Sequence, residues 1–539
     1  MLRKVRIILA VLFFAGITLL LAGTGRQWWG WMAKLQFLPS CLAGNFIVIG
    51  GIALLTLLFG RIYCSVICPL GVYQDLIIWI RRQIGLFANK VNVKRKVKAA
   101  QARKEGREVE AVSTLKAEVK HFKYNRERRL PRYIVLELTA LAVFADIQLL
   151  VALIEPYSAY GRMVHTAVGM CGGADIPVAL MIAAAATLII ISVSAWLWGR
   201  AWCSNICPVG SLLGIISRFS LFKIRFDVDK CTACGRCGRG CKASCIDMHA
   251  HTVDASRCLV CFDCIGRCKE GAISYGPRKK SASKAPSRDC TSELPLRSIP
   301  PTDSVSGPHP LTRPRVDTVL PVQPVTVPRR ETAGRPPKGD NGASRRAFLT
   351  QAAMLTSIAV LGQEKRKDGG LAEIEDKQVP QRWGRIVPPG AGSVKDFYSR
   401  CTACQLCIAS CPNSVLRPST DLGHLLQPEM GYEKGFCRPE CTACGEVCPA
   451  GAIRPVGKEE KLSIHIGMAE VNEDLCIGCA KCSTICPSGA ILMINEDGRK
   501  LATVVDTQCI GCGKCEFLCP VRPISAITVN GLEEHRHDE

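Results

Sequence analysis

Twenty-four of the 32 cysteines fall into six groups of four, and their spacing indicates iron–sulfur chemistry. Five groups have the spacing C-x2-C-x2-C-x3-C, in which three close thiolates and one more distant thiolate hold a cubane of four irons and four sulfides. These five groups are Cys231, Cys234, Cys237 and Cys241; Cys258, Cys261, Cys264 and Cys268; Cys401, Cys404, Cys407 and Cys411; Cys476, Cys479, Cys482 and Cys486; and Cys509, Cys512, Cys515 and Cys519. The sixth, with three residues in its first gap, is Cys437, Cys441, Cys444 and Cys448. The sequence therefore predicts six [4Fe-4S] clusters and one-electron transfer.

Zinc sites and disulfides are the alternatives for so many cysteines. Zinc sites usually separate two C-x2-C pairs by a longer stretch. Disulfide-dense proteins are small secreted domains, whereas this chain has 539 residues and long apolar segments. Four groups are followed directly by proline, as in bacterial ferredoxins, and the first two by Lys242 and Lys269. A positive charge at that place is expected to raise the potential of its cluster.

The composition indicates a membrane protein. A net charge of +23 with 48% hydrophobic residues suits basic cytoplasmic loops and argues against nucleic acid as a partner. Four apolar segments are each long enough to cross a hydrocarbon core of about 30 Å. They are residues 7–25, 36–60, 133–154 and 176–199. We therefore expect residues 1–221 to form a bundle of four transmembrane helices in contact with lipid and the quinone pool.

The distribution of basic residues predicts the orientation of this bundle. Residues 81–133 contain 17 Lys and Arg against five Glu, and such loops stay in the cytoplasm. The loops at 26–34 and 155–175 then face outward. This pattern predicts a multi-pass protein of the bacterial inner membrane.

A repeat follows the second and fourth apolar segments. Residues 60–71 and 199–210 are identical at eight of twelve positions, and each copy contains a C-x3-C-P motif. On a helix, cysteines four residues apart share one face. The two copies could present four thiols to one another as a redox, metal or disulfide site. The alternative is a structural helix end with proline as a stop. These candidate redox residues are Cys64, Cys68, Cys203 and Cys207.

Four apolar segments, two C-x3-C-P motifs and a following two-cluster region resemble NapH, the membrane subunit of the quinol dehydrogenase that serves periplasmic nitrate reductase. This resemblance covers residues 1–276. Four cluster motifs behind a twin-arginine sequence resemble NapG, the partner polyferredoxin. The chain thus looks like a fusion of both. The resemblance implies electron transfer from quinol toward an extracytoplasmic reductase.

Residues 222–276 are predicted to form a small α+β ferredoxin-like module. In such folds the fourth cysteine of each group binds the other cluster. This exchange predicts one cluster on Cys231, Cys234, Cys237 and Cys268 and another on Cys258, Cys261, Cys264 and Cys241. Cys245 is expected to pack against a cluster without binding it.

The remainder of the chain is divided by composition. Residues 277–343 contain 13 of the 31 prolines and read as a disordered linker. Residues 344–364 begin with Arg345 and Arg346 and resemble a twin-arginine signal anchor, with an ordinary short helix as the alternative. Residues 394–530 form a second ferredoxin-like module, with four clusters and Cys437 as its least certain ligand. The resemblance implies pairing of first with fourth and second with third motifs; adjacent pairing is the alternative.

No haem c motif, flavin site or nicotinamide site is indicated. Quinol oxidation requires a proton acceptor, and the candidates are Glu137, Asp146 and His165. Acids inside a membrane segment are functional candidates, and a buried structural pair is the alternative. The expected partner is a reductase or a small electron carrier. Two other functions remain open: an assembly or regulatory factor for a metalloenzyme, and a conduit from cytoplasmic ferredoxin.

Overall fold

The computed structural model describes most of the chain outside two long segments. The described residues are 2–104, 122, 124, 125, 127, 129–173, 176–277, 375–496 and 498–538, and the side chains of 96–104 are not among them. All of them belong to one compact unit. Apart from Pro277, the predicted linker and the twin-arginine segment lie outside the described residues.

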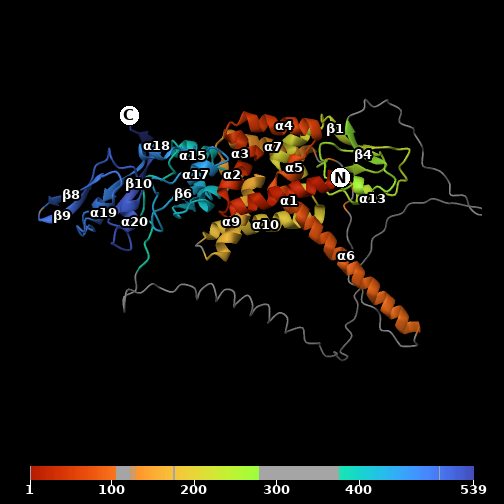
Figure 1. Cartoon of the computed structure of the whole chain (residues 1–539), viewed down its shortest axis with the longest axis horizontal. Helices are drawn as coiled ribbons and strands as arrows, with labels where there is room; N and C mark the ends of the chain where they lie inside the picture. Colours follow the sequence, from red (N-terminus) through yellow and green to blue (C-terminus); the bar gives the residue numbers. More distant parts are fainter. Residues whose placement is uncertain are drawn as a thin grey trace, which may run out of the picture. The chain divides into compact units, whose positions relative to one another are not determined.

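In the amino-terminal part, most of the described residues up to 217 are helical (Figure 1). Its helices are α1 (Leu2–Leu21), α2 (Arg26–Lys34), α3 (Phe37–Leu42), α4 (Phe46–Phe59), α5 (Tyr63–Val66), α6 (Pro69–Lys104), α7 (Arg129–Phe144), α8 (Gln148–Ile154), α9 (Pro156–Cys171), α10 (Val178–Trp198), α11 (Ala201–Asn205) and α12 (Pro208–Ser217). The carboxy-terminal half of α6 extends beyond the neighbouring helices in Figure 1.

Two of the four predicted spans are single helices of sufficient length. Among the described residues, α1 and α10 are long and apolar enough to cross a membrane. The other two predicted spans are interrupted. Residues 36–60 form α3 and the 14-residue α4, and residues 133–154 form part of α7 and then α8. At 1.5 Å per residue, α4 measures only about 21 Å.

Side chains explain where these helices begin and end. The Asn45 side chain accepts a hydrogen bond from the Val48 N–H at 3.3 Å and caps α4. Asp146, with φ of 57°, lies between α7 and α8. Glu155 caps α9, which begins at Pro156, a residue well suited to a first helical turn. The predicted connections at 26–34 and 155–175 are thus largely helical, because they contain α2 and α9.

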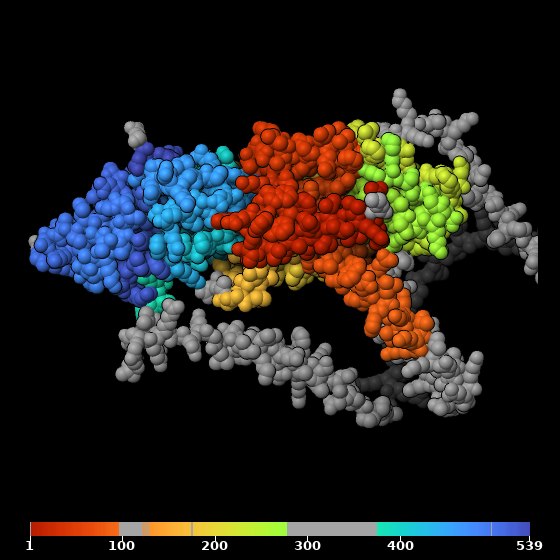
Figure 2. All heavy atoms as spheres, in the orientation of Figure 1, coloured from red at the N-terminus to blue at the C-terminus, as the bar shows by residue number. Residues whose placement is uncertain are grey.

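The outer surface of the bundle is apolar. In α10, Val178, Ile182 and Ile189 are each more than 60% exposed. In α4, Phe46 and Ile47 are more than 80% exposed. The red part of the surface in Figure 2 belongs to α1 to α4. Exposed apolar side chains in this number indicate a surface that contacts something other than water.

The two-cluster module follows α12. Its elements are β1 (Phe222–Phe226), α13 (Arg236–Arg239), β2 (Ile246–Asp247), β3 (Thr252–Val253), the 3-10 helix η1 (Ile265–Arg267) and β4 (Ile273–Pro277). β1 pairs antiparallel with β4, and β2 with β3. The module packs on the end of α4, where the Phe59 and Phe222 rings stack at 5.6 Å. The Tyr275 hydroxyl donates to the Phe59 carbonyl at 2.9 Å.

The four-cluster module has three antiparallel two-stranded sheets: β5 with β6, β7 with β10, and β8 with β9. Its elements are α15 (Val394–Arg400), α16 (Leu406–Ala409), β5 (Leu416–Pro418), the 3-10 helix η2 (Leu422–His424), β6 (Pro428–Met430), α17 (Ala443–Val447), α18 (Lys458–Leu462), β7 (Ile464–Val471), α19 (Lys481–Ile485), β8 (Ile491–Glu496), β9 (Arg499–Val504), α20 (Lys514–Leu518) and β10 (Ile527–His537). Short helices and hairpins of this kind surround cysteine loops in ferredoxin-like folds.

The four-cluster module also packs against the helical bundle. Leu406 and Val447, each 1% exposed, belong to the same apolar cluster as Leu21 and Tyr157. At its edge, Arg26 and Glu446 form an ion pair at 3.5 Å. The bundle therefore contacts both ferredoxin-like modules of the chain.

Candidate metal centres

In the two-cluster module, the structure brings the cysteines together in two groups of four. We call them site 1 and site 2. Site 1 is a pocket lined by Cys231, Cys234, Cys237 and Cys268. Site 2 is a pocket lined by Cys241, Cys258, Cys261 and Cys264, and Cys245 also lines it. Each site takes its fourth thiol from the other motif, which is the grouping that the spacing predicts. Cys245, 2% exposed, lies 3.5 Å from Cys241 through their sulfur atoms.

The four-cluster module forms four further sites, which we number 3 to 6. Site 3 is lined by Cys401, Cys404, Cys407 and Cys448. Site 4 groups Cys437, Cys441 and Cys444 with Cys411. Site 5 groups Cys509, Cys512 and Cys515 with Cys486. Site 6 is lined by Cys476, Cys479, Cys482 and Cys519. Adjacent motifs therefore exchange their fourth cysteines, and the extra residue after Cys437 does not remove it from site 4.

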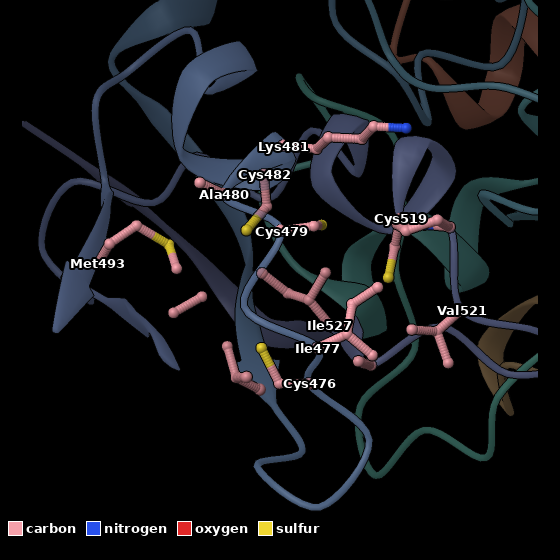
Figure 3. Close-up of a pocket in the computed structure, with 14 residues that line it drawn as sticks. Cys476, Ile477, Cys479, Ala480, Lys481, Cys482, Met493, Cys519, Val521 and Ile527 are labelled. Atoms are coloured by element: carbon pink, nitrogen blue, oxygen red, sulfur yellow. The ribbon is translucent and has the colours of Figure 1, made fainter. Parts of the chain in front are cut away.

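Site 6 is drawn in Figure 3, where the sulfur atoms of its four cysteines surround one space. Ile477, Met493 and Ile527 supply apolar walls to this space. An apolar wall lowers the local dielectric constant and limits access of water to a metal cluster.

The donor sets fit [4Fe-4S] clusters better than single ions. Within the described ranges, no three His, Cys, Asp or Glu side chains converge closely enough to hold one metal ion. A zinc ion requires four ligands within about 2.3 Å. The thiolates around a cubane bind separate iron atoms and therefore stand farther apart. Sites 1 to 6 would hold such clusters, which supply one-electron oxidation and reduction when bound.

The two C-x3-C-P motifs meet in the bundle and form what we call the paired-cysteine site. Its members, all buried, are Cys64, Cys68, Cys203 and Cys207, and their thiols lie within electrostatic range of one another. The predicted single helix through each pair is wrong. Cys64 belongs to α5 and Cys203 to α11, whereas Cys68 and Cys207 directly precede the prolines that begin α6 and α12.

Reciprocal hydrogen bonds join the two copies of the repeat. Arg61 donates to the Cys203 carbonyl at 3.0 Å, and Arg200 donates to the Cys64 carbonyl at 2.9 Å. The Arg61 Nη2 also lies 3.7 Å from the Cys64 sulfur. Both guanidinium groups are fully buried. The matching contacts indicate a pseudo-twofold axis through the paired-cysteine site.

The two arginines differ in their counter-charges. Arg200 forms a two-point ion pair with Asp75, at 3.0 and 2.9 Å. Burial alone would raise the pKa of Asp75, but Arg200, Lys242 and Arg6 together hold that pKa well below its usual range. Arg61, in contrast, has no carboxylate within ion-pair distance in the described part of the chain. Since a buried charge requires a partner, Arg61 favours an anionic group at the adjacent thiols.

Lys242, beside site 2, belongs to a network of ion pairs. Its ammonium group lies 3.0 Å from Asp263 and 3.4 Å from Asp75. These two carboxylates also pair with three arginines, so positive charge stays in excess, and the higher potential of this cluster stays a prediction. Lys269, the equivalent residue after site 1, is exposed.

The three proton-acceptor candidates do not come together. Glu137 and Asp146 are exposed on α7 and at its end, and neither forms an ion pair within the described residues. His165 lies in α9, not in a loop, and is partly buried. Nothing in their placement links them to the paired-cysteine site.

Several charged residues near the thiols were not identified from the sequence. Glu155 and Arg162 are buried in and beside α9, and Arg162 lies within electrostatic range of Cys404. Arg61 and Arg200 occupy matching positions of the repeat, so the duplication of a charged residue could have identified them. Glu155 precedes a proline, a helix-start signal that could have revealed α9.

Comparison with known proteins identifies iron–sulfur domains in this chain. The model described as "4Fe-4S dicluster domain" matches residues 469–529, and a second with that description matches residues 436–491. The chain is an iron–sulfur protein of the ferredoxin type. A model described as "4Fe-4S binding domain" matches residues 43–86 and 180–227, which contain the paired-cysteine site.

Three curated relatives are distant. An uncharacterised protein of Methanocaldococcus jannaschii is 37% identical over 97 residues, 18% of this chain and 39% of the relative. The putative electron transport protein YccM of Escherichia coli K12 is 24% identical over 46% of this chain and 60% of its own length. The ferredoxin-type protein NapH of the same organism is 23% identical over 47% of this chain and 76% of its own length.

The chain thus spans about two fifths and three fifths of the first two relatives. No solved structure matches it. The apolar helices α1 and α10, together with the similarity to NapH, indicate membrane association.

Proposed function

We propose that this protein oxidises quinol in the membrane and passes the electrons through its [4Fe-4S] clusters to a respiratory reductase outside the cytoplasm. One observation carries the proposal: the two modules contact opposite ends of α1. Near the start of the chain, Arg3 forms an ion pair with Asp263, within the site 2 motif, at 2.7 Å. Just after α1, a Cβ atom at Gly23 would lie 2.6 Å from the Ala409 carbonyl, within the site 3 motif. A 20-residue helix spans about 30 Å, the thickness of the hydrocarbon core.

The charge pattern favours one orientation across the membrane. The basic segment 81–133 begins within α6 and stays in the cytoplasm with the two-cluster module. The four-cluster module then lies outside. Arg345 and Arg346, which resemble a twin-arginine signal, and the NapG-like arrangement of four clusters support export after cluster insertion. In this proposal α3 with α4, and α7 with α8, complete two further membrane crossings.

The paired-cysteine site is the proposed redox link between the membrane and site 2. Arg61 joins the two: it donates to the Ser256 carbonyl at 3.0 Å and contacts the Cys64 sulfur. Ser256 lies two residues before Cys258, the first cysteine of the site 2 motif. Because Arg61 has no carboxylate partner among the described residues, its charge suits thiolates bound to a metal centre. The "4Fe-4S binding domain" model also matches these helix ends. A disulfide is the other redox form these cysteines could take.

Two cysteine substitutions test this link. In Cys64→Ser and Cys203→Ser variants we expect the loss of quinol-dependent reduction of site 2. The six ferredoxin-type clusters should keep their electron paramagnetic resonance (EPR) spectra after reduction by dithionite. Cys171→Ser is the matched control, because Cys171 is exposed at the end of α9. If quinol reduces site 2 at the normal rate in both variants, the C-x3-C-P motifs are structural helix ends and not redox groups.

A second function has a specific observation in its favour. Cys234 of site 1 is exposed, so a soluble carrier could reach this cluster directly. The protein would then conduct electrons outward from cytoplasmic ferredoxin without oxidising quinol. Reduced ferredoxin would reduce the clusters in this case, and a quinol analogue would not. An assembly or regulatory role predicts efficient reduction by neither donor.

A further inference from the structure

We infer that Cys404 of site 3 is the contact through which electrons pass between the bundle and the four-cluster module, and that the sites then act in the order 3, 4, 5 and 6. This inference rests on the proposed function, because it assigns a route to the electrons that quinol supplies. Electrons then enter the four-cluster module at site 3 and leave it at site 6.

Two glycines of the bundle allow the backbone of the site 3 motif to approach the bundle closely. A Cβ atom at Gly161, in α9, would lie 2.3 Å from the Cys404 carbonyl. The equivalent atom at Gly23 would lie 2.6 Å from the Ala409 carbonyl, and its φ of 83° also favours glycine. Both glycines contact the loop and helix that carry the site 3 cysteines. The next motif also reaches the bundle through Glu446 and Val447, which directly precede Cys448, the fourth cysteine of site 3.

The surroundings of Cys404 exclude water. Leu406 and Val447 are buried against bundle residues. Arg162 and Glu155 are also buried, and they place opposite charges within electrostatic range of Cys404. The entrance is therefore dry and closely packed, and its two buried charges offset one another.

The order of the sites follows from the cysteines that join them. Cys411 and Cys448 are exchanged between sites 3 and 4, and each carries the chain from one cluster to the other. The Cys437 N–H of site 4 donates to the Cys512 carbonyl of site 5 at 3.0 Å. Cys486 and Cys519 are exchanged between sites 5 and 6. These links form one unbranched series.

The exit lies at site 6. Of the sixteen ligand candidates in this module, Cys479 is exposed and the others are not. Ile477 beside it is 68% exposed, and both residues are labelled in Figure 3. An exposed ligand with an apolar neighbour suits brief contact with a one-electron carrier protein. Oxidation of one quinol to quinone releases two protons to water and two electrons. The electrons pass singly along the series, and each transfer oxidises one cluster and reduces the next.

The first experiment compares Gly161→Ala with Gly50→Ala in the full chain. Both glycines are helical, but a Cβ atom at Gly50 meets nothing within 4 Å. A short-chain quinol is mixed with each protein in vesicles, and reduction of sites 3 to 6 is followed by rapid-freeze EPR. We expect Gly161→Ala to slow this reduction relative to the wild type, because the added methyl group must push the Cys404 loop away from α9. Iron content and reduction by dithionite should be unchanged, and Gly50→Ala should match the wild type.

A second measurement does not depend on the folding of the Gly161 variant. In the wild type, the signal of site 3 should appear before that of site 6. The site 6 signal is identified by Ile477→Asp, which adds a charge beside that site alone. Earlier reduction of site 6, or a normal rate in an intact Gly161→Ala protein, would overturn the inference. A wild type that quinol does not reduce at any site would contradict the proposed function, and the inference with it.

Discussion

Replacing Asp75 by Asn tests the buried charges that connect the bundle, the paired-cysteine site and site 2. Asp75 accepts two contacts from Arg200 and one each from Arg6 and Lys242. The asparagine side chain has nearly the same shape but no negative charge. The substitution therefore leaves three cationic groups around a neutral amide.

The expected loss of stability is large. Asp75 is 11% exposed, Arg200 0% and Arg6 8%, so solvent screens these ion pairs weakly. Removing one partner of a buried ion pair costs about 3–5 kcal/mol, because the remaining charge is left without compensation. We expect a decrease of this size in the free energy of unfolding of the bundle and the two-cluster module. The pairs with Lys242 indicate that both parts would be affected together.

The assay is urea unfolding of the detergent-solubilised protein, followed by tryptophan fluorescence and by loss of iron–sulfur absorbance. Asp227→Asn is the matched control on the same module, because its ion pair with Lys230 is exposed to solvent and such pairs contribute little. A change in Asp75→Asn of about 1 kcal/mol or less, comparable to a surface pair, would refute the idea that Asp75 holds these parts together.

Three further predictions concern composition and topology. Six cubanes imply about 24 iron atoms per chain, and anaerobic analysis that finds eight or fewer on intact protein would exclude six clusters. Cys437→Ser should lose one cluster, about four iron atoms, whereas Cys245→Ala should retain all clusters. The reverse result would show that Cys245 binds a cluster and that Cys437 does not. Cysteine labelling should place position 96 in the cytoplasm and position 539 outside, and a cytoplasmic carboxy terminus would show that Arg345 and Arg346 do not direct export.

The cysteine sites could be predicted well because their information is local. Spacing alone groups three thiols of each site, and exchange of the fourth thiol follows from the known behaviour of such motifs. The pairing of motifs in the four-cluster module could not be predicted in the same way. It depends on packing such as that of Cys448 beside Cys401, which are separated by 47 residues and leave no periodic signal.

The helices were predicted less completely for a physical reason. Hydropathy reports how apolar a segment is, not where its backbone turns. Residues 36–60 contain a break because Asn45 caps a new helix, and residues 133–154 contain one because Asp146 adopts a left-handed backbone. The partners of Arg61 and Arg200 each lie in the opposite copy of the repeat, so tertiary packing alone reveals them.

Reduction of the clusters by quinol, in the absence of any other donor, tests the proposed quinol oxidation most directly. The full-length protein is placed in anaerobic vesicles, a short-chain quinol is added, and the visible iron–sulfur absorbance is recorded. We expect bleaching of clusters in both modules, and no bleaching in the Cys203→Ser variant. Clusters that dithionite bleaches fully and quinol leaves oxidised would contradict the proposal that this protein oxidises quinol.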